Sequence, residues 1–245
     1  GNIVTHTQIT VSPEENLEIR KISLTNHSEH VRVLEITSYF EVILTLQSAD
    51  AAHPAFSNLF VRTEFIPEYN CLVANRRPRE EGKSTLWAMH AVTVDGELIG
   101  PVQYETDRAK FIGRNRNLTD PAAMTVDAPL SNSVGSVLDP IMSIRCRVKI
   151  EPGKTVHVIY TTGMSEQKEE VLKFAEKYND VGAAIRAFEL AWTRSQVEAR
   201  YLGLQENEEE DFQQMLPHIF FTSPLRRKRE CMIVSNVQGQ SGLWK

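Results

Sequence analysis

Residues 31–65 of the sequence read VRVLEITSYFEVILTLQSADAAHPAFSNLFVRTEF and contain two segments with a two-residue period. In the first segment the apolar residues are Leu34, Ile36, Phe40, Val42, Leu44 and Leu46, and the polar ones between them are Glu35, Thr37, Tyr39 and Glu41. This period places the two sets on opposite faces of a β-strand. The segment predicts one strand of about sixteen residues, although about five or six is usual. Such a strand requires a large sheet.

The second alternating segment, LFVRTEFI, covers residues 59–66 and follows a stretch of small and polar residues at 48–58. Two extended segments joined in this way predict either antiparallel neighbours or strands in the facing layers of a sandwich. The sequence alone leaves both arrangements open.

The remaining residues up to 164 also predict β-structure. Further extended segments are expected at 3–11, 17–26, 70–75, 85–94, 102–105, 142–150 and 155–162. Val94-Asp95-Gly96-Glu97 carries a hairpin signal, and Glu151-Pro152-Gly153-Lys154 is typical of a tight turn. Many strands without intervening helices indicate a mainly β, antiparallel sandwich rather than a βαβ fold.

From residue 165 to residue 245 the period becomes helical. Ser165 is the expected N-cap of a first helix, and Val181 to about Tyr201 forms a second helix that Gly203 ends. A third helix is expected at about 207–221. The basic run Arg226–Arg229 is interpreted as a solvated connector, with contact to a nucleic acid or an anionic lipid as the alternative.

Composition excludes several classes of protein. The chain has 245 residues, is 41% hydrophobic and 24% charged, and carries a net charge of −5, which argues against a general nucleic-acid binder. The sequence has no apolar run of the roughly 18 residues that a membrane span needs, and no signal-peptide pattern. Cys71, Cys146 and Cys231 are far apart, which indicates free thiols rather than a disulfide framework or a metal site. We expect a cytoplasmic protein without a structural metal.

The residues with most chemical interest lie between Lys110 and Pro140, in a long polar segment that glycine and proline interrupt. Its candidate site residues are Arg114, Asn115, Arg116 and Asp120. Guanidinium groups suit bidentate contacts with sugar hydroxyls or phosphate. The alternative is that both arginines pair with Asp107, Asp120 or Asp127 and only hold the loop in place.

Sequence motifs for known catalytic sites are absent: there is no G-x-S-x-G, no P-loop and no H-E-x-x-H. The seven histidines show no metal-ligand spacing. His90 lies among apolar residues of an expected strand and is interpreted as a hydrogen-bonded core or edge residue.

Several motifs together resemble one enzyme family. ITVSPEENLEIRKISLTN, LEITSYFEVILTLQSADAAHPAFSNLFVRTEF, FIGRNRNLTDPAAM, VGSVLDPIMSIRCRVKIEPGK and GQSGLWK are similar to glycoside hydrolase family 94, the glycosyltransferase-36-type phosphorylases. The likeness is strongest to the C-terminal region of cyclic β-1,2-glucan synthases and covers nearly the whole chain. Relatives tend to have glycine between the two arginines, where this chain has Asn115.

The resemblance implies a galactose-mutarotase-like supersandwich at residues 1–164 and linker helices at 165–245 that lead into an (α/α)₆ barrel outside this chain. In that family the barrel holds the catalytic acid, and inorganic phosphate is the co-substrate of the phosphorylases. No cofactor and no catalytic residue is therefore expected in these 245 residues. The implied partners are a β-glucan or oligosaccharide, the barrel of the same protein and a second subunit.

Three hypotheses for the function follow. The first is a non-catalytic carbohydrate-associated domain that supports the barrel, the dimer and the rim of the active site, with Arg114, Asn115, Arg116 and Asp120 at that rim. The second is an aldose epimerase of mutarotase type, which needs an acid and a base such as His90 and a glutamate around the sugar ring. The third is a purely structural dimerisation domain that touches no sugar.

Overall fold

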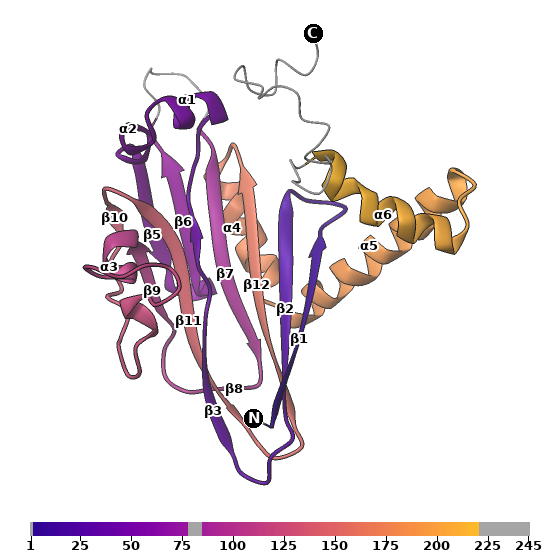
Figure 1. Cartoon of the computed structure of the whole chain (residues 1–245), viewed down its shortest axis with the longest axis horizontal. Coiled ribbons are helices and arrows are strands. Elements are labelled where there is room, and N and C mark those ends of the chain that lie inside the picture. Colours follow the sequence, from indigo (N-terminus) through magenta and orange to yellow (C-terminus); the bar gives the residue numbers. More distant parts are fainter. Residues whose placement is uncertain (1, 78–84, 221–245) are drawn as a thin grey trace, which may run out of the picture. The chain divides into compact units, whose positions relative to one another are not determined.

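A computed structural model describes residues 2–77 and 85–220 of the chain (Figure 1). Within them the chain forms two compact units, which meet between residues 192 and 193 of the sequence. The first unit is a sandwich of two antiparallel sheets with helices against one of them. The mainly β supersandwich predicted from the sequence is confirmed.

In the described residues the larger sheet has seven strands in the order β1-β2-β12-β7-β6-β5-β10. Their bounds are β1 Ile3–Val11, β2 Leu17–Asn26, β12 Thr155–Ser165, β7 Trp87–Asp95, β6 Cys71–Arg76, β5 Val61–Ile66 and β10 Gly135–Ser136. One face of this sheet packs against the smaller sheet, and the other face packs against α4 and the first half of α5.

The smaller sheet is built around β11 (Pro140–Ile150). β3 (Arg32–Thr37) and β4 (Phe40–Glu41) pair with one side of β11, and β8 (Glu97–Leu98) and β9 (Gln103–Asp107) pair with the same strand as well. Side chains between the two sheets form the main core, which includes Leu72, Met142, Ile144, Val148, Ile150 and Val158.

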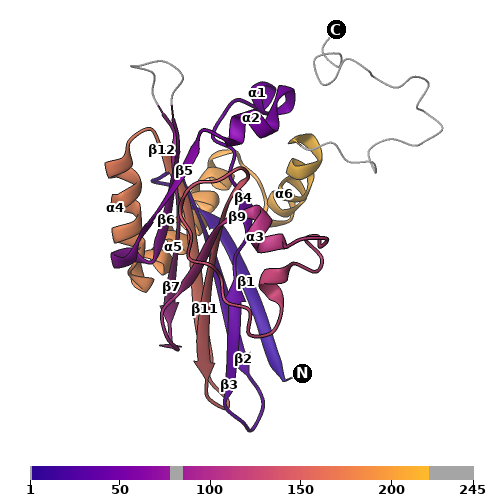
Figure 2. The ribbon, with the colours of Figure 1, turned by 90° about the vertical axis from the view of Figure 1, so that its left-hand side faces the viewer.

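The helices lie at the edges and on the outer faces. α1 (Gln47–Ala52) and α2 (Pro54–Asn58) form the crossover between β4 and β5, and α3 (Arg108–Ile112) follows β9. α4 (Lys168–Tyr178) covers the larger sheet with Val171, Phe174, Ala175 and Tyr178, the stripe that the sequence predicts. Figure 2 shows α4 on one side of the two sheets and α3 on the opposite side.

α5 (Val181–Tyr201) continues from the first unit into the second, where α6 (Glu206–Phe220) follows. The turn after α5 uses Gly203 at φ +71°, whose N–H donates to the carbonyl of Arg200. Both helices were predicted from the sequence and are confirmed. The basic run Arg226–Arg229 and Cys231 lie outside the described residues.

The single sixteen-residue strand predicted for residues 31–46 is wrong, because the chain breaks at Ser38 between β3 and β4. The Ser38 hydroxyl accepts a hydrogen bond from the backbone N–H of Ile144 at 3.0 Å, at the place where a strand would offer its own carbonyl. After the break the alternation holds as far as Leu44, which is buried, but Leu46 is 77% exposed. β4 and β5 lie in facing sheets, so the sandwich arrangement holds.

Two local predictions are also wrong. Asp95-Gly96 does not make a hairpin, because β7 pairs with β12 and β6 whereas β8 pairs with β11 in the other sheet. Gly96 crosses between the sheets at φ +154°, and a Cβ there would come within 2.6 Å of Val156. Ser165 is not the N-cap of α4, because β12 extends through it and the helix begins at Lys168.

Candidate functional site

The segment with the candidate arginines, residues 113–134, is an ordered cover on the outer face of the smaller sheet; we call it the arginine loop. α3 leads into it, and the Asp107 carboxylate caps that helix by accepting from the N–H of Ala109 at 2.9 Å. Gly113 then turns the chain at φ +83°, where a Cβ would lie 2.6 Å from that of Ala122. This turn therefore needs glycine.

The tip of the arginine loop, residues 114–120, is exposed throughout. The Arg116 Nη1 atom donates to the Thr125 hydroxyl at 3.0 Å and lies 3.6 Å from the Asp120 carboxylate. For Arg114 the described part of the chain holds no carboxylate within 4.0 Å. The structure thus brings Arg116 and Asp120 together and leaves Arg114 in solvent.

Asn115, between the two arginines, has a left-handed backbone with φ +60°. Glycine adopts this conformation without strain, and asparagine is one of the few other residues that tolerate it. Asn115 can therefore take the conformation that a glycine would supply at this point of the loop.

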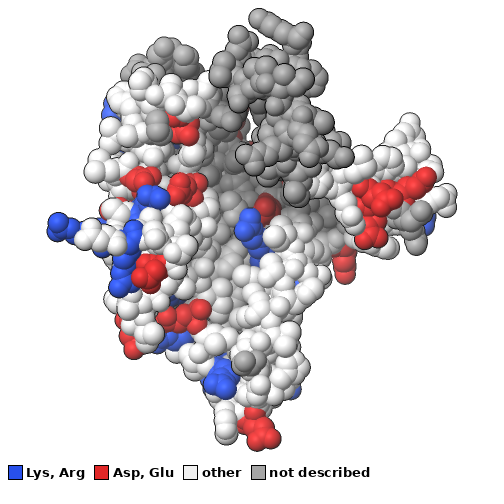
Figure 3. Space-filling model, viewed as in Figure 1, with Lys and Arg blue, Asp and Glu red and all other residues white. Residues whose placement is uncertain are grey.

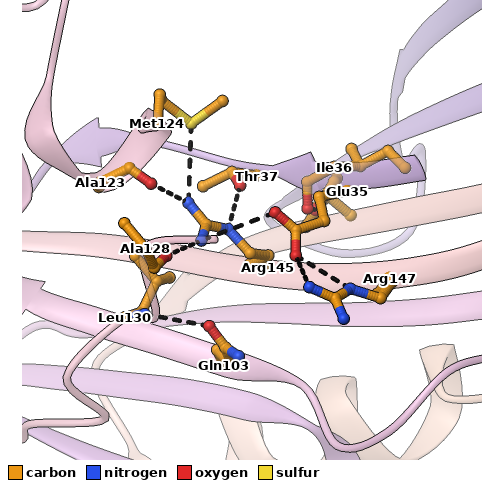
Figure 4. Close-up of polar contacts among 11 residues, drawn as sticks. Glu35, Ile36, Thr37, Gln103, Ala123, Met124, Ala128, Leu130, Arg145 and Arg147 are labelled. Carbon is orange, nitrogen blue, oxygen red and sulfur yellow. Dashed lines mark hydrogen bonds and ion pairs between the residues drawn. The ribbon is translucent and has the colours of Figure 1, made fainter. Parts of the chain in front are cut away.

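The base of the loop is held by the buried side chain of Arg145 from β11, which is 4% exposed. Figure 4 shows its guanidinium between the loop and β3. Nη1 donates to the carbonyl of Ala128 at 2.6 Å, Nη2 donates to the carbonyl of Ala123, and Nε donates to the Thr37 hydroxyl at 2.8 Å. Burial lowers the pKa of Arg145 below its ordinary value, and Glu35, 3.9 Å away, opposes that shift. One cation thus fixes two carbonyl groups of the loop.

Glu105 of β9 holds the other end of the loop and is 2% exposed. Its carboxylate accepts hydrogen bonds from the hydroxyls of Ser131 and Ser133 at 2.7 and 2.8 Å. It also accepts from the backbone N–H groups of Thr106 and Asp107 at 3.0 and 3.1 Å. These bonds satisfy a buried charge that would otherwise be costly.

An apolar cluster lies beneath the loop and consists of Phe111, Ile112, Ala123, Leu130 and Ile141, with Tyr39 packed against it. The Leu130 N–H also donates to the side-chain oxygen of Gln103 at 3.0 Å. The arginine loop is therefore anchored by both apolar and polar contacts, while the side chains of its tip stay exposed.

Sequence reasoning identified the loop but missed its two anchors, Arg145 and Glu105. A signal for Arg145 exists: it shares the face of β11 with Ile141 and Ser143, which are both buried, whereas the next residues on that face are Arg147 and Lys149. A strand face that changes from apolar to charged indicates partial cover. Nothing in the sequence tells which segment provides that cover.

A second feature is a groove of about 1280 Å³ on the inner face of the larger sheet, beside the break at Ser38. Its lining includes Val11, Glu18, Arg20, Ile22, Phe40 and Met164. Glu18 and Arg20 form an ion pair at the surface of the groove. Figure 3 shows a hollow in the middle of this face and, around α3, basic and acidic side chains side by side.

His90 lies at the floor of this groove and is 3% exposed. Its Nε2 atom is 2.8 Å from the Ser38 hydroxyl and its Nδ1 atom is 2.8 Å from the Thr162 hydroxyl. Its ring stacks on Tyr160 with centroids 5.4 Å apart. Burial lowers the pKa of His90 to about 3, so the ring is neutral near pH 7. Both nitrogens are occupied, which confirms a hydrogen-bonded core histidine and leaves neither nitrogen free for a sugar.

The two described cysteines, Cys71 and Cys146, are free and buried in the cores, as the sequence predicts. Burial raises the pKa of the Cys71 thiol to about 12 and that of the Cys146 thiol to about 11. Both are therefore protonated and unreactive near neutral pH. Among the described helices, none is long and apolar enough to cross a membrane.

The comparisons of this sequence with known proteins agree on one family. Residues 1–181 match the family model described as "Glycosyl hydrolase 94, supersandwich domain". The chain is 32% identical over 244 residues to the cyclic beta-(1,2)-glucan synthase NdvB of Rhizobium meliloti (strain 1021). It is 24% identical over 177 residues, 72% of its length, to the solabiose phosphorylase of Paenibacillus borealis.

The matching region is a small part of these relatives: all of the chain matches 9% of NdvB, and 72% of it matches 22% of the phosphorylase. A solved polysaccharide lyase, BACCELL_00875, aligns with 69% of this chain and 21% of its own, at 13% identity and a TM-score of 0.39. This structural similarity is too weak to support a family assignment, which depends on the sequence matches alone.

Proposed function

The chain belongs to glycosyl hydrolase family 94 as its supersandwich domain, and from this premise we propose that it supports the active site of a longer glucan-processing enzyme without catalysing the reaction. The observation that carries the proposal is the arginine loop, whose base is held by Arg145 and Glu105 while Arg114 and Arg116 stand exposed at its tip. A fixed base with a solvent-facing cationic tip suits one wall of a site formed with another domain.

The proposed ligand of the tip is a β-glucan or its oligosaccharide, because the relatives bear the names of a cyclic β-1,2-glucan synthase and a solabiose phosphorylase. Guanidinium groups can donate paired hydrogen bonds to neighbouring hydroxyls, and to inorganic phosphate if the enzyme is a phosphorylase. Asn115 and Asp120 support the two arginines. The catalytic acid belongs to a barrel domain, and a homodimer contact on the sandwich is a further part of this proposal.

The test uses the longer enzyme, with Arg114→Ala and Arg116→Ala compared with wild type. We expect KM for β-1,2-glucan oligosaccharides to rise about tenfold, which corresponds to the loss of roughly one charged hydrogen-bonding contact. The matched control is Arg147→Ala, which removes an exposed guanidinium of the same sheet that pairs with Glu35. The purely structural hypothesis is correct instead if KM is unchanged in both loop variants.

A second experiment tests whether the 245-residue chain acts alone. We expect it to release no sugar phosphate from these oligosaccharides and to leave the mutarotation of fresh α-glucose at the buffer rate. Turnover in the first assay would contradict the non-catalytic role, and faster mutarotation would support the aldose epimerase hypothesis.

A further inference from the structure

The two sheets of the sandwich differ in width. β3 and β4 lie end to end along one side of β11, where β4 pairs with residues 141–142 and β3 with residues 145–150. β8 and β9 in turn pair with residues 148–149 and 140–145 of β11. Because both pairs lie end to end along β11, the smaller sheet is three strands wide, whereas the larger one has seven in a row.

The line of β3 and β4 faces β7 and β12 of the larger sheet. The Tyr160 hydroxyl of β12 donates to the carbonyl of Ile36 at 3.1 Å, and Ser38 bonds to His90 of β7 at 2.8 Å. β1 and β2 come next in the larger sheet, beyond β12. They therefore extend past the edge of the smaller sheet, and the groove lies in the corner between that edge and their inner face.

Apolar side chains on this overhang are exposed. Ile9 and Val11 of β1 are 56% and 64% exposed and stand opposite Arg20 and Glu18 of β2, so all four share the inner face. Met164 at the end of β12 is 51% exposed and also lines the groove. A run of exposed apolar residues along one sheet face indicates a surface that something covers.

The outer edge of β3, which reaches the groove at Thr37, has backbone groups that do not face β11. The N–H of Ser38 donates to Ile144, and that of Val42 donates to Pro140. In an antiparallel ladder, bonded residues alternate, so Leu34 and Ile36 bond to β11 while Val33, Glu35 and Thr37 direct their N–H and C=O groups outward. Among the described residues, β3 pairs with no strand other than β11. This edge can therefore accept one more strand.

We propose that the groove takes up an extended polypeptide segment from a part of the same protein outside residues 1–245, which adds to β3 as a fourth strand of the smaller sheet. Its inward side chains would be apolar and would cover Val11, Ile22, Phe40 and Met164. A single extended segment suffices, because it can bond to the edge of β3 through its backbone and cover the inner face of β1 and β2 with its side chains. In the NdvB relative, the matching region is only 9% of the chain, so such relatives have ample polypeptide to supply it.

Charge favours this occupant over a second copy of the chain. The groove is lined by four glutamates, Glu15, Glu18, Glu166 and Glu170, and by one arginine, Arg20. Two copies that met through this groove would bring their acidic rims together. The segment is therefore expected to carry lysine or arginine beside its apolar residues.

Hydrogen–deuterium exchange of the β3 amides, in the 245-residue chain and in the longer enzyme, tests the proposal. In the chain alone, Val33, Glu35 and Thr37 should exchange much faster than Leu34 and Ile36. In the longer enzyme these three amides should slow by about a hundredfold or more, as expected for groups that join a ladder. Unchanged exchange in the longer enzyme would overturn the proposal.

Glu35→Pro and Glu35→Ala form a matched pair for the same measurement. Proline removes the outward N–H together with the carboxylate, whereas alanine removes only the carboxylate. Both variants lose the ion pair with Arg147 of β11, and neither removes a backbone hydrogen bond to β11. Protection of Val33 and Thr37 in the longer enzyme should fall at least tenfold with proline and stay within twofold of wild type with alanine. Equal effects of both variants would contradict strand addition. Melting of the 245-residue variants checks that both fold.

Two other occupants would be visible in the 245-residue chain itself. Protection that grows with protein concentration would identify a second copy, and protection that appears only with added β-1,2-glucan would identify a saccharide; either outcome overturns the proposal. The exchange readout needs no activity and does not depend on Arg114 or Arg116. It can therefore fail or succeed independently of the proposed role of the arginine loop.

Discussion

The arginine loop meets the same kinds of side chain in opposite surroundings at its base, where β9 and β11 supply them, and at its tip, which carries its own. At the base, Arg145 and Glu105 are almost fully buried, and each makes three or more hydrogen bonds to fixed groups. At the tip, Arg116 has a 3.6 Å ion pair and one hydroxyl contact, and Arg114 is exposed. The same side chain thus fixes the fold at one end of the loop and remains available to a ligand at the other.

The comparison shows why the loop can be both long and ordered. Each buried charge would cost several kcal/mol without its partners, so alternative loop conformations that break those contacts are penalised. The tip carries no such penalty. Its conformation is set by the base and by local backbone preferences, which leaves its side chains free to adapt to another molecule.

The largest expected effect distinguishes the buried arginine at the base of the loop from an exposed arginine of the same strand. Arg145→Ala leaves the carbonyls of Ala123 and Ala128 without their donor and should lower the free energy of unfolding by about 3–5 kcal/mol. The control Arg147→Ala removes an exposed partner of Glu35 and should cost less than about 1 kcal/mol. Urea unfolding measures both. Equal losses would mean that Arg145 does not anchor the loop.

The second prediction concerns the pH dependence of stability, which should arise from His90, a buried neutral base, rather than from the buried cation Arg145. The pKa of His90 is about 3 in the fold and about 6.5 when unfolded, so the unfolded chain binds the extra proton between these values. Stability should be full above about pH 6.5 and fall as the pH drops toward 3, by an amount of the order of 4 kcal/mol.

The measurement is urea unfolding between pH 7 and pH 4 for wild type and His90→Gln. Glutamine keeps a hydrogen-bonding side chain near Ser38 and Thr162 but does not titrate, so its pH slope should be shallower. Parallel slopes would show that another group causes the loss at acidic pH.

The third prediction concerns the backbone of the tip. Asn115→Val places a β-branched residue at φ +60° and should destabilise the loop by about 1–2 kcal/mol, whereas Asn115→Gly should be close to neutral. Native-state exchange of amides within residues 113–134 reports this local cost. If valine and glycine behave alike, the left-handed conformation at residue 115 is not required.

The smallest expected effect is that of Arg116→Ala on stability. Its ion pair with Asp120 is exposed, and such pairs contribute less than about 1 kcal/mol. We expect a change of under about 0.5 kcal/mol in urea unfolding, alongside the rise in KM expected in the longer enzyme. A large loss of stability would mean that Arg116 has a structural role like that of Arg145.

Much of the fold could be predicted from the sequence because strand periodicity is a local property. The expected segment 17–26 is β2 without change, and the stripe of α4 is the predicted one. The errors arose where a distant residue competes with the local pattern. Ser38 ends β3 because it bonds to Ile144, more than 100 residues away. At Asp95-Gly96 the hairpin signal is overridden because the next strand belongs to the other sheet.

The site was predicted in part. Glycine, proline and arginine spacing identified the loop, and the structure pairs Arg116 with Asp120, one of the three acidic partners considered. The role of the four candidate residues in binding, and the domain boundary expected at residue 164, stay predictions. Arg145 and Glu105 could not be assigned, because their function depends on a loop that folds over them from elsewhere in the chain.

The position of β12 has a consequence for how the chain folds. β12 is the last strand among the described residues, yet it lies between β2 and β7, and its bonds to β2 join residues about 130 positions apart. During synthesis the β1–β2 hairpin must wait until residue 165 has left the ribosome before the larger sheet can form. Contacts of such high sequence separation slow folding and prolong the exposure of unpaired edges. We therefore expect the nascent sandwich to depend on chaperones until β12 arrives.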